Sequence, residues 1–504
     1  MHEDRIRHAG LRDRVTSAEH AASLIQPGET VAMSGFTGSG YPKAVPLALA
    51  TRIEQAHAAG VPFQIKLMTG ASTAPELDGA LAKADAIALR MPFQSDPDAR
   101  KRINDGTLDY IDIHLSHVAQ HVWFGFYGPI DTAVIEVSAI REDGTLVPST
   151  SVGNNKTWLD LAKKVIVEVN DWQPADIEGM HDIYYGTALP PHRKPIPLEH
   201  VRDRIGDTAL RCDPDKIVAV VRTHGPDRNS PFTPIDVTSE RIAAHLIDFL
   251  KHEVAQGRLP PNLLPLQSGV GNIPNAVLAG LAKSGFRGLT AFTEVIQDGM
   301  LDLLRDGVLD VASCTGFALS PEANEAFKRD IAFYRERIIL RTQEMSNHPE
   351  LVRRLGCIGM NGMIEADLYG NVNSTHVMGS RIQNGIGGSG DFARNGFMSV
   401  FLSPSTAKGG SISALVPMVS HVDHTEHDVS VIVTEQGLAD LRGLTPKQRA
   451  RLLIANCAHP DYRDALQDYF DRALHYSYGK HTPHLLPEAL SWHQRWLETG
   501  SMEA

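Results

Sequence analysis

The chain contains 504 residues, of which 42% are hydrophobic and 21% are charged. Domains usually hold about 100–200 residues, so this length predicts two or three domains, and the apolar fraction excludes general disorder. The net charge of −12 excludes a protein that mainly wraps the nucleic-acid backbone. A local nest of backbone N–H groups can nevertheless hold a small anion.

The cysteines and the first residues of the chain favour a reducing compartment. Cys212, Cys314, Cys357 and Cys457 lie far apart, without the paired spacing of a thiolate zinc site or a disulfide framework. Residues 1–15 are charged, and no run approaches the roughly 20 apolar residues of a membrane span. We expect buried thiols in a soluble, cytoplasmic protein with neither a membrane nor a nucleic acid as partner.

The first predicted elements are a helix and a strand. Thr16 begins a capping-box pattern with Glu19, which predicts a helix through Ile25 that ends at Pro27 and Gly28. Residues 30–34 then predict a strand, followed by a glycine turn over 35–40.

Continuous runs of β-branched residues recur along the chain and alternate with helical patterns. Such runs are typical of parallel strands that helices cover on both faces, so the predicted class is α/β with mostly parallel sheets. The predicted strands are 133–137, 165–169, 217–221 and 429–433. Leucine and aromatic residues at helical spacing predict a helical segment over about the last fifty residues.

An internal repeat divides the chain. Residues 34–45 and 268–277 share a glycine turn followed by proline and an apolar helix start, and 144–152 resembles 370–377. We therefore predict two similar open α/β domains, 1–225 and 226–504, the second with the helical tail. The break falls in the polar, proline-bearing stretch 223–234.

Two neighbouring segments of the second half are candidates for chemistry. The turn 267–274 follows a strand, and it fits an oxyanion or acyl-ligand turn, a tight structural turn, or a dinucleotide turn that lacks its third glycine at Pro274. Glu294 ends the apolar strand 288–292, where ligands of α/β sheets usually bind. Its alternative role is a cap or an ion pair.

Three further segments carry open alternatives. Residues 384–392 hold four glycines within six residues, which fits a backbone lying against a ligand or a flexible surface loop. Lys408 could contact a phosphate or be merely solvated. His421, Asp423, His424 and nearby acids invite a metal site, although their spacing differs from HExxH and favours a polar loop.

A carboxylate is the reactive group that remains, because no GxSxG elbow and no cysteine nucleophile with an obvious histidine partner is recognisable. A carboxylate that attacks an activated acyl group forms an anhydride. Such an intermediate is useful when the leaving group returns to the enzyme, so this chemistry favours transfer over hydrolysis.

Several segments together resemble the acetyl-CoA hydrolase/transferase family. The resemblance runs nearly end to end, and within the family it points to the succinyl-CoA:acetate group of class I CoA-transferases known from acetic acid bacteria. One departure from class I enzymes at large is Thr293-Glu294-Val295-Ile296 in place of Ser-Glu-Asn-Gly. The segments are GFTGSGYPKAVP (35–46), QSGVGNIPNAV (267–277), TEVIQDG (293–299), NGMIEADLYGNVNS (361–374), NGIGGSGDF (384–392), SPSTAKGG (403–410), HVDHTEHDVSVIVTEQGLADLRG (421–443), HPDYRDALQDYFDRA (459–473) and KHTPHLLPEALSWHQRW (480–496).

The resemblance implies a role for each matching position. Glu294 would be the nucleophile, forming an acyl-glutamyl anhydride and then a glutamyl-CoA thioester. The backbone N–H of Val270 with the Asn347 side chain, and the backbone of Gly388, would each stabilise an oxyanion, and Glu435 would support the site. CoA contacts are implied for Gly269, Val270, Gly271, Asn272, Ile273, Ile364, Asn384, Gly388 and Lys408, and peripheral contacts for Arg228 and Ser72.

The resulting prediction is a CoA-transferase that moves CoA from succinyl-CoA to acetate. CoA would be substrate and covalent intermediate, with no tightly bound cofactor and no metal, and the resemblance implies a homodimer. An acetyl-CoA hydrolase, a transferase for another short acid, a CoA-binding regulator without turnover and an NAD enzyme are the alternatives.

Overall fold

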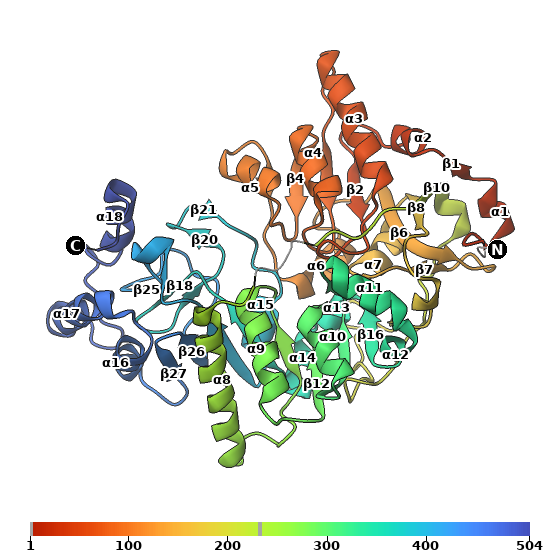
Figure 1. The fold of residues 1–504 in the computed structure, drawn as a ribbon. Coiled ribbons are helices and arrows are strands. Elements are labelled where there is room, and N and C mark those ends of the chain that lie inside the picture. Colours follow the sequence, from red (N-terminus) through yellow and green to blue (C-terminus); the bar gives the residue numbers. More distant parts are fainter. Residues whose placement is uncertain (1–3, 230–233, 504) are drawn as a thin grey trace. The chain divides into compact units, whose positions relative to one another are not determined.

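A computed structural model describes residues 4–229 and 234–503 and forms two compact units (Figure 1). Unit 1 comprises Met1–Pro231, Thr290–Arg305 and Leu309–Leu355, and unit 2 comprises Phe232–Leu289, Asp306–Val308 and Gly356–Ala504. The chain therefore leaves unit 1 and later returns to it. The units are not the two predicted repeat halves, and the division at residue 225 stays a prediction. Residues 230–233 of the predicted break lie outside the described residues.

The first sheet of unit 1 is parallel apart from one hairpin. Its strand order is β1-β10-β8-β6-β2-β3-β4-β5, and β7 pairs with β6 in the antiparallel direction. The strands are β1 (Val15–Thr16), β2 (Thr30–Met33), β3 (Ile65–Met68), β4 (Ile87–Met91), β5 (Asp109–Tyr110), β6 (Thr132–Ile140), β7 (Leu146–Pro148), β8 (Lys164–Asn170) and β10 (Ile217–Thr223).

Further strands of unit 1 come from the returning segments. Strand β14 (Leu309–Cys314) pairs in parallel with β16 (Ile338–Arg341), which pairs with β9 (His181–Asp182). Strand β12 (Leu289–Phe292) precedes β13 (Val295–Gln297), and β13 pairs with β15 (Gly316–Ala318).

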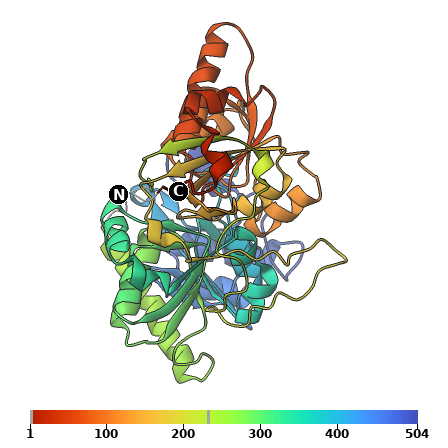
Figure 2. The same cartoon turned by 90° about the vertical axis from the view of Figure 1, so that its right-hand side faces the viewer.

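Helices surround these strands. In Figure 2 the red-to-orange helix α3 rises beside the strands of the first sheet, and it packs against α2. The helices of unit 1 are α1 (Ala9–Arg12), α2 (Ala18–Ser23), α3 (Ala44–Ala58), α4 (Ala80–Lys83), α5 (Pro97–Asn104), α6 (Val118–Trp123), α7 (Asn155–Leu161), α10 (Asp298–Arg305), α11 (Pro321–Arg329), α12 (Ile331–Arg335), α13 (Gln343–Ser346) and α14 (Pro349–Leu355).

Unit 2 contains a second mostly parallel sheet. Its strands follow the order β27-β26-β22-β17-β11, and only β26 and β27 are antiparallel. These strands are β11 (Leu266–Ser268), β17 (Ile358–Gly362), β22 (Met398–Leu402), β26 (Val431–Thr434) and β27 (Gly437–Asp440). Short strands pair beside it: β18 (Glu365–Asp367), β19 (Val372–Asn373), β20 (His376–Val377), β21 (Arg381–Ile382), β23 (Thr406–Ala407), β24 (Ile412–Ser413) and β25 (Leu415–Val416).

The helices of unit 2 cover this sheet and form its tail. Helices α8 and α9 lie side by side in Figure 1. The bounds are α8 (Val237–Ala255), α9 (Asn272–Lys283), α15 (Ser389–Asn395), α16 (Pro446–Asn456), α17 (Pro460–Tyr476) and α18 (Ser491–Thr499).

The structure confirms the α/β class, and it corrects the predicted start of the first helix. Ser17, and not Thr16, is the N-cap, because its hydroxyl accepts from the His20 N–H while Thr16 is extended and pairs with β10. The helix ends at Ser23. The two repeated segments have the same local structure, since β2 and β11 each lead through a glycine turn into a helix, and β6–β7 and β18–β19 are both antiparallel hairpins.

Burial follows the sequence pattern. Every residue of β6 is buried, as expected for a strand covered on both faces. Cys314, Cys357 and Cys457 are buried and Cys212 is partly exposed; all four are free thiols. Within the described residues, no helix has the length and apolar composition needed to cross a bilayer.

Candidate active site

The backbone of Glu294 is fixed where the chain leaves β12 for β13. The Thr293 N–H donates to the Ser313 carbonyl at 2.9 Å. The Glu294 carbonyl accepts from the N–H groups of Thr315 at 2.9 Å and Gly316 at 3.2 Å. The predicted position of Glu294 at a strand end is therefore confirmed. Thr315 and Gly316, which hold this backbone, were not predicted, because no local sequence signal marks them.

Asn347 lies beside the Glu294 carboxylate. It is fully buried and forms the C-cap of the short helix α13. Its Nδ2 donates to Glu294 Oε1 at 2.5 Å. The structure thus places one of the residues implied by the resemblance in contact with the proposed nucleophile, both within unit 1.

The environment of Glu294 makes its carboxylate unusually basic. Burial raises the pKa of Glu294 to about 7, against the opposing hydrogen bond from Asn347. The residue keeps some solvent exposure even though protein surrounds it on most sides. A carboxylate that is poorly hydrated and more basic is a better nucleophile, and near neutral pH a large fraction of it is ionised.

The segment that follows β7 secures the neighbourhood of Glu294. The N–H of Val152 donates to the Thr315 carbonyl at 2.8 Å, and the N–H of Gly153 donates to Thr315 Oγ1 at 3.0 Å. Ser151 forms a bridge with Gly316. The strand end that carries the nucleophile is therefore anchored by residues distant in sequence.

The predicted CoA-contacting positions of unit 2 gather at one edge of its sheet. Strands β26, β22, β17 and β11 are adjacent and parallel, so their carboxyl ends share that edge. Gly388 is the N-cap of α15, which packs on β17 and β22, and Asn384 precedes it. The residues that follow the strand ends are Gly269, Val270, Gly271, Asn272 and Ile273 after β11, Ile364 after β17, Lys408 after β22 and Glu435 after β26.

Within unit 2, few atoms pack against the glycine turn after β11. Gly271 has φ +138° and ψ −174°, a conformation that essentially only glycine adopts. Val270 is 49% exposed. Pro274 lies in the first turn of α9, where a missing backbone N–H costs little. Val270 is therefore accessible at this turn, while the Gly269 N–H donates to the Met360 carbonyl at 3.0 Å.

Lys408 and Glu435 belong to one connected segment. Lys408 is exposed and has a left-handed backbone with φ +53°. Glu435 is buried and accepts from the Ser405 N–H at 2.8 Å and from Gln436 Nε2 at 2.9 Å. Burial raises the pKa of Glu435, but these hydrogen bonds outweigh it and leave the pKa below its ordinary value. Glu435 therefore anchors the strand that leads to Lys408.

Arg228 and Ser72 belong to unit 1 and have protein partners there. Arg228 Nε lies 2.9 Å from Glu76 Oε1, and Ser72 Oγ accepts from the Ser95 N–H at 3.0 Å. Ser72 is buried, whereas Arg228 is largely exposed. The charged guanidinium of Arg228 is therefore at the surface, and the hydroxyl of Ser72 is not.

The histidine-rich segment is a polar loop, as the second alternative predicted. Asp423 accepts from the Ser374 N–H at 2.7 Å and from Thr375 Oγ1 at 2.8 Å. Among the described residues, no three His, Cys, Asp or Glu side chains are arranged to hold a metal ion.

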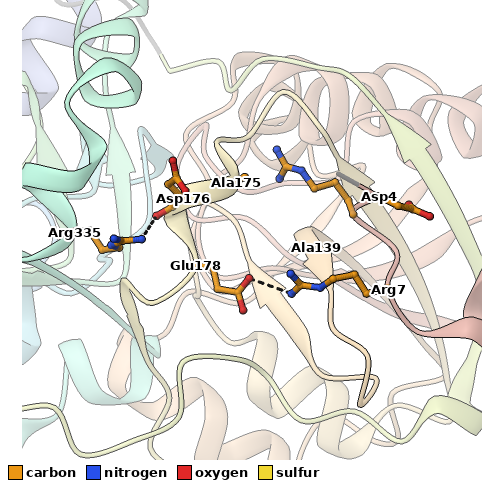
Figure 3. Close-up of a pocket in the computed structure, with 8 residues that line it drawn as sticks. Asp4, Arg7, Ala139, Ala175, Asp176, Glu178 and Arg335 are labelled. Atoms are coloured by element: carbon orange, nitrogen blue, oxygen red, sulfur yellow. Dashed lines mark hydrogen bonds and ion pairs between the residues drawn. The ribbon is translucent and has the colours of Figure 1, made fainter. Parts of the chain in front are cut away.

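A separate cavity of about 290 Å³ lies in unit 1 (Figure 3). Its basic side chains already have protein acceptors: Arg7 Nη2 lies 3.1 Å from Glu178 Oε2, and Arg335 Nη1 donates to the Asp176 carbonyl at 3.4 Å. The lining contains none of the predicted site residues. It consists of Asp4, Arg5, Arg7, Ala139, Ala175, Asp176, Glu178 and Arg335.

Comparison with known protein families now identifies the family. The model of the acetyl-CoA hydrolase/transferase N-terminal domain matches residues 2–222, and the model of the C-terminal domain matches residues 327–470. The chain belongs to this family. It is an enzyme of the acetyl-CoA hydrolase/transferase family, whose substrate is CoA in acylated form.

Relatives within the acetyl-CoA hydrolase/transferase family carry two kinds of activity. The chain is 52% identical to a succinyl-CoA:acetate CoA-transferase of Clostridium kluyveri, covering 99% of this chain and 92% of the relative. It is 46% identical to a propanoyl-CoA:succinate CoA transferase of Escherichia coli, with 96% and 98% covered. It is also 45% identical to an acetyl-CoA hydrolase of Schizosaccharomyces pombe, with 98% of each chain covered.

Solved structures show the same fold in more distant proteins. RipA from Yersinia pestis matches with a TM-score of 0.70 at 23% identity, covering 92% of this chain and 98% of RipA. A 4-hydroxybutyrate CoA-transferase from Porphyromonas gingivalis matches with a TM-score of 0.62 at 22% identity, with the same coverage.

Proposed function

We propose that this enzyme transfers CoA between short carboxylic acids, with succinyl-CoA as donor and acetate as acceptor. The observation that carries the proposal is the Glu294 carboxylate, which has a fixed backbone, an amide donor at 2.5 Å and a pKa raised to about 7. The 52% identical relative, a succinyl-CoA:acetate CoA-transferase, supports the choice of substrates.

The reaction proceeds through two covalent states of Glu294. Its carboxylate oxygen attacks the thioester carbonyl of succinyl-CoA, the C–S bond breaks, and a succinyl-glutamyl anhydride and CoA thiolate form. The thiolate attacks the glutamyl carbonyl of the anhydride, which releases succinate and leaves a glutamyl-CoA thioester. Acetate then attacks this thioester to form an acetyl-glutamyl anhydride, and the thiolate takes the acetyl group to give acetyl-CoA and free Glu294. No net proton is consumed.

Each attack produces an oxyanion that needs fixed donors. In the proposal these donors are the Asn347 side chain, which lies beside Glu294, and the backbone N–H groups of Val270 and Gly388. A single donor of this kind contributes about 3 kcal/mol to stabilising the transition state.

The turns of unit 2 bind the CoA moiety. Backbone N–H groups at the start of α9 suit its anionic groups, and the exposed Lys408 suits a phosphate. The proposed contacts are Gly269, Val270, Gly271, Asn272, Ile273, Ile364, Asn384, Gly388 and Lys408, with Arg228 as a peripheral contact and Glu435 as support for the segment of Lys408.

Acetyl-CoA hydrolysis is the second candidate, because relatives such as the 45% identical S. pombe protein are acetyl-CoA hydrolases. The same intermediates lead to hydrolysis if water, and not an acid, attacks them. We further propose that the enzyme is a cytoplasmic homodimer that serves acetate metabolism and the tricarboxylic acid cycle. A mass of two chains in light scattering would support the dimer.

The decisive experiment incubates the enzyme with succinyl-CoA alone and measures its intact mass. We expect a CoA adduct that borohydride reduces and that Glu294→Ala does not form. A wild-type enzyme without an adduct would overturn the mechanism.

Addition of acetate then separates the two activities. Transfer predicts acetyl-CoA at the rate of succinyl-CoA loss, with ping-pong kinetics. Free CoA appearing at that full rate would instead establish hydrolysis.

A further inference from the structure

The loop that carries Asn384 and Gly388 has little means of fixing its own backbone. It is rich in glycine, and Gly387 has φ +60°. Each glycine leaves the unfolded and folded backbone more freedom than another residue would. Under the proposed function, Gly388 must nevertheless present its N–H at a defined point, so other residues have to hold the loop.

One buried imidazole contacts both flanks of this loop. His424 is 2% exposed, and its Nε2 lies 3.3 Å from Ser374 Oγ and 3.2 Å from Ser389 Oγ. Ser389 is the first residue of α15, directly after Gly388. Its hydroxyl donates to the Ile386 carbonyl at 2.8 Å, so toward His424 it acts as acceptor of an Nε2 proton.

The other flank is held through Ser374. The Ser374 carbonyl accepts from Asn384 Nδ2 at 3.2 Å. The neighbouring Asp423 fixes Ser374 and Thr375 by accepting from the Ser374 N–H at 2.7 Å and from Thr375 Oγ1 at 2.8 Å. The chain of contacts therefore runs from Asp423 and His424 to the two ends of the loop.

His424 itself is well anchored. Its backbone N–H and carbonyl both bond to Val372, at 3.0 and 2.8 Å, and its ring lies 4.7 Å from the Phe401 ring. Phe401 belongs to β22 of the sheet. Because the His424 ring is fixed relative to the sheet, its hydrogen bonds can fix the loop relative to the sheet as well.

We propose that His424, supported by Asp423, is a positioning residue for the acyl-CoA thioester: it holds Asn384 and Gly388 in place through Ser374 and Ser389. The proposal rests on the proposed function of Gly388. It assigns the histidine-rich segment a role other than metal binding or a merely solvated loop. Support of this type fixes a functional group whose own residue has no side chain.

The test compares His424→Ala with His424→Gln, whose amide Nε2 can donate at a similar reach. We expect His424→Ala to slow formation of the glutamyl-CoA adduct by about 30-fold and to raise KM for succinyl-CoA, while KM for acetate stays within about 3-fold. His424→Gln should recover to within about 5-fold of the wild type, because it restores the donated hydrogen bond. His427→Ala, whose side chain is 81% exposed, is the control and should leave the kinetics unchanged.

Three results would overturn the proposal: His424→Ala within 2-fold of the wild type, His424→Gln as slow as His424→Ala although both fold, or equal losses for both substrates. If His424→Ala does not fold, Ser389→Ala removes the same contact with less loss of packing and should slow adduct formation in the same direction; an unchanged rate would contradict the proposal. The two hypotheses fail separately. A wild type without an adduct overturns the proposed function, whereas an adduct that forms equally fast in His424→Ala overturns only the positioning role.

Discussion

The two glycine turns of the repeat have the same strand–turn–helix setting but opposite surroundings. In the first, Arg228 N–H donates to the Gly38 carbonyl at 2.9 Å, and the Gly38 N–H donates to Asn229 Oδ1 at 2.9 Å. A Cβ on Gly38 would lie 1.7 Å from the Arg228 carbonyl oxygen. In the second turn, the nearest atom of its own unit to a Cβ on Gly269 is the Met360 carbonyl oxygen at 3.7 Å.

Under the proposed function, the difference means that one glycine turn binds another segment of the protein and the other binds a ligand. The first turn uses its backbone groups to bind the segment 227–229 of the same chain. In the second turn the Gly269 N–H donates to the Met360 carbonyl at 3.0 Å and Val270 is 49% exposed; under the proposed function this turn binds CoA. Under that proposal, the two turns have similar sequences but different functions.

A second equivalence strengthens the comparison. In unit 1, Thr150 Oγ1 donates to Asp227, and in unit 2 Thr375 Oγ1 donates to Asp423. Thr150 and Thr375 follow the two equivalent hairpins. In the first half, Asp227 belongs to the segment 227–229 that binds the turn. In the second half, Asp423 lies next to His424, which contacts the loop of Gly388.

The largest expected difference concerns two lysines, Lys43, which follows the first turn, and Lys408, which follows β22 in unit 2. Lys43 is buried and lies 2.5 Å from Glu136 and 2.7 Å from Asp227, whereas Lys408 is exposed. Lys43→Met leaves two buried carboxylates without their cation and should lower the free energy of unfolding by about 3–5 kcal/mol. Lys408→Met should change it by less than about 0.5 kcal/mol.

Urea unfolding measures the stability of both variants, and steady-state kinetics measure KM for succinyl-CoA. Lys408→Met should raise KM for succinyl-CoA by about 5-fold, the loss of one exposed phosphate contact. Equal losses of stability in the two variants would remove the distinction between a structural and a ligand-binding cation.

The next effect compares the glycines themselves. Gly38→Ala places a methyl group against backbone that cannot move aside, so it should cost about 3 kcal/mol of unfolding free energy. Gly269→Ala meets ordinary contact distances and should cost less than about 1 kcal/mol, yet raise KM for succinyl-CoA. Thermal unfolding and KM separate the two outcomes, and a stable Gly38→Ala would show that the first turn is not closed.

The smallest effect is a shift in pH dependence, which Asn347→Ala causes in addition to the loss of its proposed oxyanion contact. Asn347 lowers the pKa of Glu294 by donating to its carboxylate, so Asn347→Ala should raise that pKa above about 7. The ionised form reacts, so activity falls as the pH falls through this pKa. The acid limb of the kcat/KM profile should therefore move up by about one pH unit. Ser346→Ala, beside Asn347, is the control and should leave the limb in place.

The sequence predicts those features that local patterns determine. The runs around 133–137, 165–169 and 217–221 are strands because continuous β-branched residues suit a sheet covered on both faces. Glu294 was placed at a strand end by the same pattern. The first helix starts one residue later than predicted, because pairing with β10 extends Thr16 and leaves capping to Ser17.

Features that depend on distant partners could not be predicted. Asn347 ends a four-residue helix with no local signal of function, and only the family resemblance pointed to it. Neither the filling of the first turn by Arg228 and Asn229 nor the link from Asp423 to the loop of Gly388 follows from spacing, since each depends on how loops meet in the folded unit. The return of Thr290–Arg305 and Leu309–Leu355 to unit 1 likewise could not be predicted from local patterns.

That return has a consequence for synthesis of the protein. Strand β9 pairs with β16, and the buried Asp182 of β9 bonds to Arg341 of β16. At about 5–20 residues per second, on the order of ten seconds pass between the translation of these two strands. During that interval the edge of β9 and the Asp182 carboxylate have no native partner. Unit 1 therefore completes its native strand pairing only after β16 has been synthesised, although its first sheet lies entirely within residues 15–223.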